Sequence, residues 1–148
     1  MGKKKRHWLW NLLIVLTIFV CILAFIAHYK NWTKIEGDHL RILSGVYYKE
    51  IKFNQIDSVV MVEKIPQMER INGFSAWAKE KGIFKDSLRP DISVRVYVDN
   101  LRQPKIKLVQ NDSLLLYLNF SDSLETQRMY EMLSEKIEVL NALNTEPN

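Results

Sequence analysis

The chain has 148 residues and a formal net charge of +4, a length that allows one globular domain with flanking segments. Four of its 21 lysines and arginines stand together as KKKR at residues 3–6, which leaves 17 basic and 17 acidic side chains in the remainder. A protein that binds nucleic acid neutralises phosphates with a basic face, so this neutral remainder excludes nucleic acid as an expected partner.

The first predicted element is a membrane-spanning helix over residues 8–28. Its segment WLWNLLIVLTIFVCILAFIA holds no charged residue, and a helix of about 20 residues spans about 30 Å, the thickness of a bilayer's hydrocarbon core. A cleavable signal peptide is the alternative, but its apolar region is usually about 7–15 residues long, and AFIAHYK matches a cleavage site poorly. The aromatic residues expected to anchor the span at the membrane interface are Trp8, Trp10, Tyr29 and Trp32.

Charge predicts the orientation of this helix. The basic N-terminal segment, residues 1–7, is expected to stay in the cytoplasm under the positive-inside rule. The part of the chain that follows the span is then expected outside the membrane. The lipid bilayer is therefore one expected partner. We interpret residues 29–37 as a linker, 38–143 as the exported domain and 144–148 as a flexible tail.

Past the linker, the chain predicts six or seven antiparallel strands. Residues 39–43 and 46–53 meet at Ser44-Gly45, which favours a tight hairpin. The clearest alternation is DISVRVYVD, where every second residue is isoleucine or valine. That segment is the predicted strand 91–99, and the other predicted strands are 56–65, 104–110 and 114–120.

The last predicted element is an amphipathic helix that ends near Leu143. Asp122 is a suitable N-cap with Glu125 three residues later, and no glycine or proline interrupts the segment that follows. Its apolar stripe has helical spacing and consists of Tyr130, Leu133, Ile137 and Leu140. The predicted fold is therefore mainly β (α+β): a bent sheet or barrel of about seven strands, capped by one C-terminal helix.

The segment RINGFSAWAKEKGIF, residues 70–84, fits neither a helix nor an alternating strand. We interpret it as a corner of the fold, with a positive-φ turn at Asn72-Gly73, a second bend at Gly82, and its aromatic residues Phe74, Trp77 and Phe84 closing the core. The alternative is an exposed rim that binds a partner or ligand. The residues of that candidate rim are Asn72, Gly73, Trp77, Lys79 and Lys81.

Four segments together resemble the bacterial PH-domain family, in which a pleckstrin-homology-like module often accompanies transmembrane segments. They are IEGDHLRILSGVYYKEIKFNQIDSV, IPQMERINGFSAWAKEKGIF, ISVRVYVDNLRQPKIKLVQNDSLLLYLNF and SLETQRMYEML, and they cover about residues 36–140. The most distinctive part is NGF at 72–74 followed by KGIF at 81–84. The resemblance implies a bent antiparallel sheet of seven strands capped by one helix, and it implies no general catalytic activity.

The same resemblance does not bring phosphoinositide binding with it. In eukaryotic PH domains the headgroup lies against a long basic loop between the first two strands, whereas the corresponding connection here is Ser44-Gly45, without a lysine or arginine. We therefore expect no phosphoinositide site in this chain.

The sequence also offers no pattern of catalytic or metal-ligating residues. The three histidines, His7, His28 and His39, are not grouped with acids or with Cys21 at metal-ligand spacing, and no nucleophile elbow or phosphate-binding glycine loop occurs. Cys21 lies within the apolar run and can form no disulfide within the chain. We expect no enzyme, no cofactor and no metal site.

These observations favour a single-pass, membrane-anchored PH-like domain that acts as a non-catalytic interaction or scaffold module at the cell envelope. Its partner would be another envelope protein or peptide, bound at a free strand edge or an apolar patch away from the helix. The alternative is a lipid or small-ligand binding domain at the membrane surface. That alternative predicts Trp77 at the end of the domain from which the chain enters the membrane.

Overall fold

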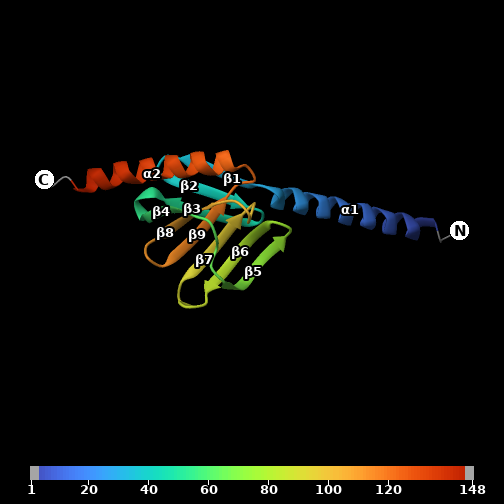
Figure 1. Cartoon of the computed structure of the whole chain (residues 1–148). Helices are drawn as coiled ribbons and strands as arrows, with labels where there is room; N and C mark the ends of the chain where they lie inside the picture. The colour runs from blue at the N-terminus through green and yellow to red at the C-terminus, as the bar shows by residue number, and fades with distance from the viewer. Residues whose placement is uncertain (1–3, 146–148) are drawn as a thin grey trace.

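The computed structural model describes residues 4–145, and this part of the chain is mainly β with an α+β arrangement, as predicted (Figure 1). Its helices are α1 (Lys4–Tyr29), α2 (Ser123–Thr145) and the short 3₁₀ helix η1 (Phe53–Gln55). The nine strands of the described residues are β1 (Asn31–Glu36), β2 (His39–Ser44), β3 (Tyr47–Lys52), β4 (Ile56–Val62), β5 (Met68–Ala76), β6 (Lys79–Asp86), β7 (Ser93–Val98), β8 (Lys105–Gln110) and β9 (Leu114–Asn119).

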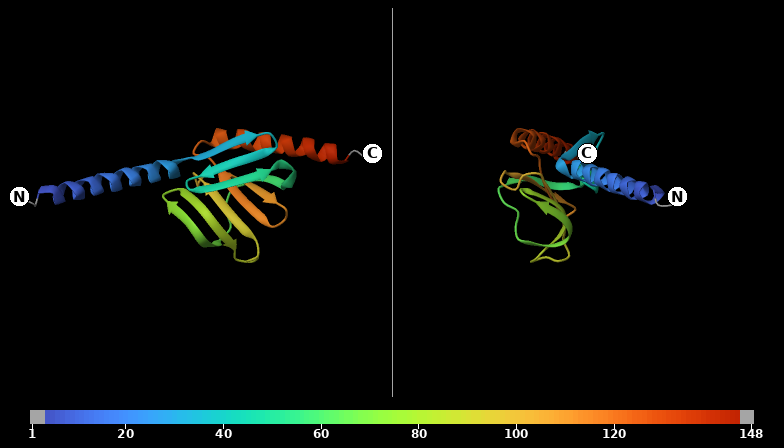
Figure 2. Two further views of the ribbon diagram at one scale, coloured as in Figure 1. Left: turned by 180° about the vertical axis from the view of Figure 1, so that it is seen from behind. Right: turned by 90° about the vertical axis from the view of Figure 1, so that its right-hand side faces the viewer.

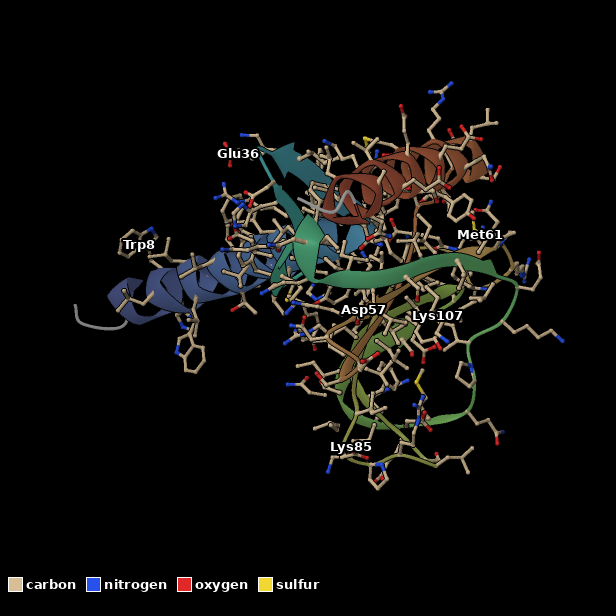
Figure 3. All side chains as sticks on the ribbon, turned by 90° about the vertical axis from the view of Figure 1, so that its left-hand side faces the viewer. Trp8, Glu36, Asp57, Met61, Lys85 and Lys107 are labelled. Atoms are coloured by element: carbon tan, nitrogen blue, oxygen red, sulfur yellow. The ribbon has the colours of Figure 1, made fainter. Side chains whose placement is uncertain are left out.

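Helix α1 projects from the strands as a long rod (Figures 1 and 2). Its segment from His7 to Tyr29 is long and apolar enough to cross a membrane, with a mean hydropathy of 2.8, and no part of it is buried within the chain. Trp8 lies on this rod well away from the strands that carry Asp57 and Lys107 (Figure 3). Apart from its last turns, the described part of this helix packs on nothing in its own chain, as expected of a membrane span outside its bilayer.

The strands form two sheets. The smaller sheet has the order β1-β2-β3, and the larger has the order β4-β8-β9-β7-β6-β5. The strand count is thus nine rather than about seven. All pairs are antiparallel except β7 with β9, which run parallel because the β8–β9 hairpin folds back and inserts β9 between β8 and β7.

The interpretation of residues 29–37 as a linker is wrong. Strand β1 begins at Asn31, two residues after α1 ends, and pairs with the whole length of β2. The predicted hairpin after β2 is confirmed, but its turn is Gly45-Val46 rather than Ser44-Gly45, because Ser44 pairs with Tyr47 inside the ladder. The domain is therefore joined to the apolar helix almost directly.

The hydrophobic core lies on both faces of the larger sheet. On one face the smaller sheet and α2 cover a cluster that includes Leu40, Tyr97, Leu116 and Leu133. On the other face Val94, Val96 and Val98 pack with Phe84 and Tyr117 beneath the segment that crosses from β4 to β5. The valine face predicted for DISVRVYVD is therefore confirmed as buried.

Helix α2 is confirmed as the amphipathic cap of the larger sheet. The Asp122 carboxylate accepts a hydrogen bond from the Leu124 N–H at 2.9 Å, so it caps the helix as predicted. Leu133 and Ile137 of the predicted stripe are buried, and Tyr130 and Leu140 pack beside them. The C-terminal part of α2 runs out at the end of the domain opposite α1 (Figures 1 and 2).

Candidate functional site

The glycine-containing segment 70–84 forms a β-hairpin, not a corner. Strands β5 and β6 pair antiparallel, and Trp77-Ala78 makes the two-residue turn between them. The turn predicted at Asn72-Gly73 is wrong, because both residues lie inside β5 beside a bulge. Gly73 faces Gly82 across the pair, and a Cβ placed on Gly82 would stand 2.5 Å from the Gly73 Cα. These glycines serve the close approach of two backbones.

The predicted core aromatic residues of this hairpin have three different environments. Phe84 is buried, as predicted. Phe74 is only half-buried. Trp77 is 87% exposed, so its assignment to the core is wrong and the alternative of an exposed position is correct. Its φ of 52° places a bulky side chain in the left-handed region that glycine or asparagine usually occupies.

The five residues of the candidate rim do not share one surface. Asn72 and Trp77 are exposed, and Gly73 is half-buried. The Lys79 side chain is only 18% exposed because it turns toward α1. Lys81 contradicts the prediction of a rim residue outright, since its side chain is fully buried. Trp77 is thus the one large exposed side chain of the set.

The tip of this hairpin packs against the last turns of α1. The Trp77 and Phe25 rings meet edge to face with 6.4 Å between their centroids. The Phe74 and His28 rings lie closer, with centroids 5.2 Å apart. A small cavity of about 70 Å³ remains between them. Trp77 therefore lies at the end of the domain from which α1 emerges, which is the position that the lipid-binding alternative predicts.

Three separate elements contact the chain at this end of α1, two of them through polar groups. The Lys79 ammonium donates a hydrogen bond to the Tyr29 carbonyl oxygen at 2.6 Å and lies 4.8 Å from the Tyr29 ring centre. Lys30 pairs with Glu125 in the first turn of α2 at 3.2 Å. Gly45, in the turn between β2 and β3, lies so close to His28 that a Cβ there would be 2.6 Å from the imidazole ring.

The first residue of β1, Asn31, is the centre of a buried polar network. Its side-chain amide donates hydrogen bonds to the carbonyl oxygens of Tyr97 at 2.6 Å and Asn119 at 2.8 Å. Its side-chain oxygen accepts a hydrogen bond from the Ser44 hydroxyl at 2.6 Å, and its backbone N–H donates to the Asp99 carboxylate at 2.8 Å. Asn31 thus ties the start of the smaller sheet to two strands of the larger one.

The Asp99 carboxylate joins this network to Lys81. The Lys81 ammonium lies 2.8 Å from Asp99 Oδ1, and both side chains are fully buried. Burial lowers the pKa of Lys81, and the attraction of Asp99 opposes that shift. Lys79 adds a second cation at 3.9 Å. A lysine inside β6 is tolerated because a carboxylate meets it at the junction between the helix and the sheets.

The residues predicted as membrane anchors all have exposed side chains. Trp8 and Trp10 lie near the start of α1, and Tyr29 ends the helix. Trp32 belongs to β1 and not to the helix, with the Lys30 ammonium 5.7 Å from its ring centre. The two ends of the apolar helix therefore both carry exposed aromatic rings, as an interfacial belt requires.

A second surface feature lies at the opposite end of the domain. An apolar groove of about 650 Å³ separates the C-terminal half of α2 from η1 and from the turn between β1 and β2. Its lining residues are Gly37, Asp38, Phe53, Asn54, Met132, Glu135, Lys136, Val139 and Leu140. Val139 is exposed, and Lys136 lies 5.1 Å from the Phe53 ring centre. We call this feature the distal groove.

The described residues contain no group of three or more histidine, cysteine, aspartate or glutamate side chains that could hold a metal ion. Cys21 is a free thiol on α1. The strongest buried ionic group, Lys81 with Asp99, sits inside the junction and opens into none of the cavities named above. Its geometry serves to hold two sheets and a helix together.

Sequence reasoning missed most of the junction. The sequence predicts Asn31 in a linker and Lys81 on an exposed rim, and it assigns no role to Asp99. The only local signal was Asn31 standing between the end of the apolar run and an alternating segment. The rest depends on residues far apart in sequence, since Asn31 reaches Asp99 and Asn119 across 68 and 88 positions.

Comparison of the chain with protein-family models, with curated proteins and with solved structures found no match. The resemblance to bacterial PH domains remains a prediction on the quoted segments.

Proposed function

We propose that this chain is a single-pass membrane protein whose β domain is a non-catalytic interaction module at the cell envelope. In this proposal α1 crosses the bilayer with the basic residues 1–7 in the cytoplasm, and the domain stands outside. The length and apolarity of α1 support the span, and the excess of positive charge before it supports the orientation.

The observation that carries the proposal is the distal groove. The C-terminal half of α2 lines this groove and lies at the end of the domain opposite α1 (Figure 2). A segment of another protein could approach there without meeting the membrane. Its walls are apolar at Phe53, Val139 and Leu140, and charged at its margin by Asp38 and Lys136. A concave apolar surface with a few polar groups at its rim is typical of sites that take a peptide or a helix.

The edge of the larger sheet is a weaker candidate for the same role. Strand β5 lies at that edge, and most of its residues are exposed. The bulge between Arg70 and Asn72 and the charged side chains of Glu69 and Arg70 disfavour the addition of another strand there. The distal groove therefore fits the expected apolar patch away from the helix better than β5 fits the expected free edge.

The groove is tested by photo-crosslinking in intact cells. A photoreactive amino acid at Val139 lies in the groove, whereas one at the adjacent Glu138 is also exposed on α2 but lies outside the groove. We expect one discrete adduct with an envelope protein from Val139 and none from Glu138. Adding Met132→Glu, which puts a charge into the groove wall, is expected to abolish that adduct while the full chain keeps its thermal stability.

Two results contradict the proposal. The first is the same set of adducts from Val139 and Glu138, which indicates non-specific contact. The second is a Val139 adduct that persists with Met132→Glu, which places the partner somewhere other than the groove.

A further inference from the structure

The geometry points to a second membrane contact in this chain: we infer that the tip of the β5–β6 hairpin, with Trp77 at its end, inserts into the interfacial layer of the lipid leaflet from which α1 emerges. The ligand is a phospholipid bilayer surface. This inference rests on the span assigned to α1 under the proposed function. It adds a second contact, which holds the domain against the membrane surface.

The depth of Trp77 follows from its partner on α1. Its ring meets Phe25, which precedes Tyr29 by four residues, and at 1.5 Å per residue this places Phe25 about 6 Å nearer the membrane centre than Tyr29. Tyr29, at the end of the apolar segment, marks the level of the interface. Trp77 therefore reaches below the level at which the helix leaves the apolar layer.

The exposure of Trp77 agrees with this depth. A tryptophan that is 87% exposed at a hairpin turn presents most of an apolar ring to water, with its indole N–H free for a polar partner. The membrane interface suits both properties, since it is apolar on one side and wet on the other. No other element of the described chain covers the ring beyond its edge contact with Phe25.

A second turn reaches the same end of the helix. The turn between β2 and β3 approaches His28 at Gly45, and the next residue, Val46, is 72% exposed. Both turns point toward the junction with α1, whereas the loop between β6 and β7 lies at the far end of the larger sheet (Figure 1). Lys85, near the end of β6, marks that far end in Figure 3. Trp77 and Val46 are thus two apolar side chains on the side of the domain that faces the bilayer.

The contact is tested with single-tryptophan variants of the full chain in phosphatidylcholine vesicles, some containing brominated lipid, which quenches tryptophan fluorescence on contact. One variant keeps only Trp77. A second keeps only Trp10 and reports whether α1 is inserted. A matched control carries Leu88→Trp as its one tryptophan, because Leu88 is 90% exposed in the loop at the other end of the same hairpin.

We expect Trp77 to be quenched by brominated lipid several-fold more strongly than the Leu88→Trp control, with emission shifted to the blue. Quenching of Trp10 without quenching of Trp77 overturns the inference and leaves the membrane span standing. Blue-shifted emission from Trp77 that brominated lipid does not quench also overturns it, because protein then covers the ring. If neither Trp77 nor Trp10 is quenched, α1 is not inserted, and the span fails together with the inference.

Discussion

Asn31 shows how one polar side chain sets the relation between the helix and the domain. An asparagine side chain offers two donors and one acceptor oxygen, and here Asn31 uses all of them on fixed partners. Its backbone N–H is held by Asp99, so the chain direction is fixed within two residues of the end of α1. Buried polar groups that are fully satisfied favour one geometry, since every alternative leaves a donor or acceptor unpaired.

Lys81 and Asp99 provide a test of this network. Lys81→Met removes the buried cation closest to the Asp99 carboxylate and leaves only Lys79, at 3.9 Å. We expect a loss of unfolding free energy of about 3–5 kcal/mol, the usual cost of removing one partner of a buried ion pair. The measurement is urea unfolding of the full chain in detergent micelles, followed by tryptophan fluorescence. The control is Lys81→Met combined with Asp99→Asn, which removes both charges.

The double variant should be clearly more stable than the sum of the two single losses predicts, because no unpaired charge remains. Losses that add up fully would contradict a coupled pair. A Lys81→Met variant as stable as the parent chain would show that the ammonium gains nothing from Asp99.

At the scale of elements, the hairpin of β5 and β6 explains where the sequence could be interpreted and where it could not. Helix α2 and strand β7 were predictable because their apolar residues keep one period throughout. In β5 the bulge shifts the alternation of inward and outward side chains. In β6 the sequence predicts Lys81 on the surface because it is charged, although the structure buries it. Period alone cannot identify strands whose pattern is broken by a bulge and whose interior position is charged.

Strand β1 was missed for a related reason. Its alternation is clear, but its inward residues begin with Asn31, and its outward residues include Trp32, which fits a membrane anchor equally well. Of the five residues predicted for the candidate rim, Trp77 is the one large side chain that the structure leaves exposed. The partners that give Trp77 its position, Phe25 and His28 with Phe74, belong to elements whose meeting no local pattern encodes.

The glycine pair makes a prediction at this scale. In Gly82→Ala the added Cβ would overlap the Asn72 carbonyl oxygen and approach the Gly73 Cα to 2.5 Å, at a φ of +155°. We expect Gly82→Ala to destabilise the chain by more than the roughly 1–2 kcal/mol of backbone strain alone, because two strand backbones must separate. Thermal unfolding of the full chain measures this loss.

Gly37→Ala is the matched control for that experiment. Gly37 also has a positive φ, +62°, but a Cβ there has no atom within 4 Å, so only backbone strain is added. Equal losses for Gly37→Ala and Gly82→Ala would mean that the close approach of β5 and β6 has no energetic consequence.

On the scale of the whole molecule, our proposals assign a different contact to each end of the domain. The turns that meet α1 face the membrane in our proposal. The distal groove is lined by the C-terminal half of α2, which lies at the end of the domain opposite α1 (Figure 2). A domain on a flexible linker would present every face in turn. Contacts from β6 and the turn after β2 to the last residues of α1, and from α2 to Lys30 just after it, instead hold one orientation. This fixed orientation would keep the groove at a constant height above the bilayer.

The rigidity of the junction can be measured between two spin labels, and the chain supplies the first site itself. Cys21 is the only cysteine and is exposed on α1, and Leu88→Cys adds a second label in the exposed loop between β6 and β7. Because Asn31, Lys79 and Lys30 all tie the helix end to the domain, we expect a single narrow distance distribution in vesicles.

A short Gly-Ser insertion between Lys30 and Asn31 separates the helix from β1 and should broaden that distribution. The same insertion between Ser87 and Leu88, in the labelled loop, controls for local mobility of the second label and should broaden it less. A distribution that is already broad in the uninterrupted chain would mean that the domain moves freely about the helix end, and the seat of Trp77 on the membrane would then have no fixed depth.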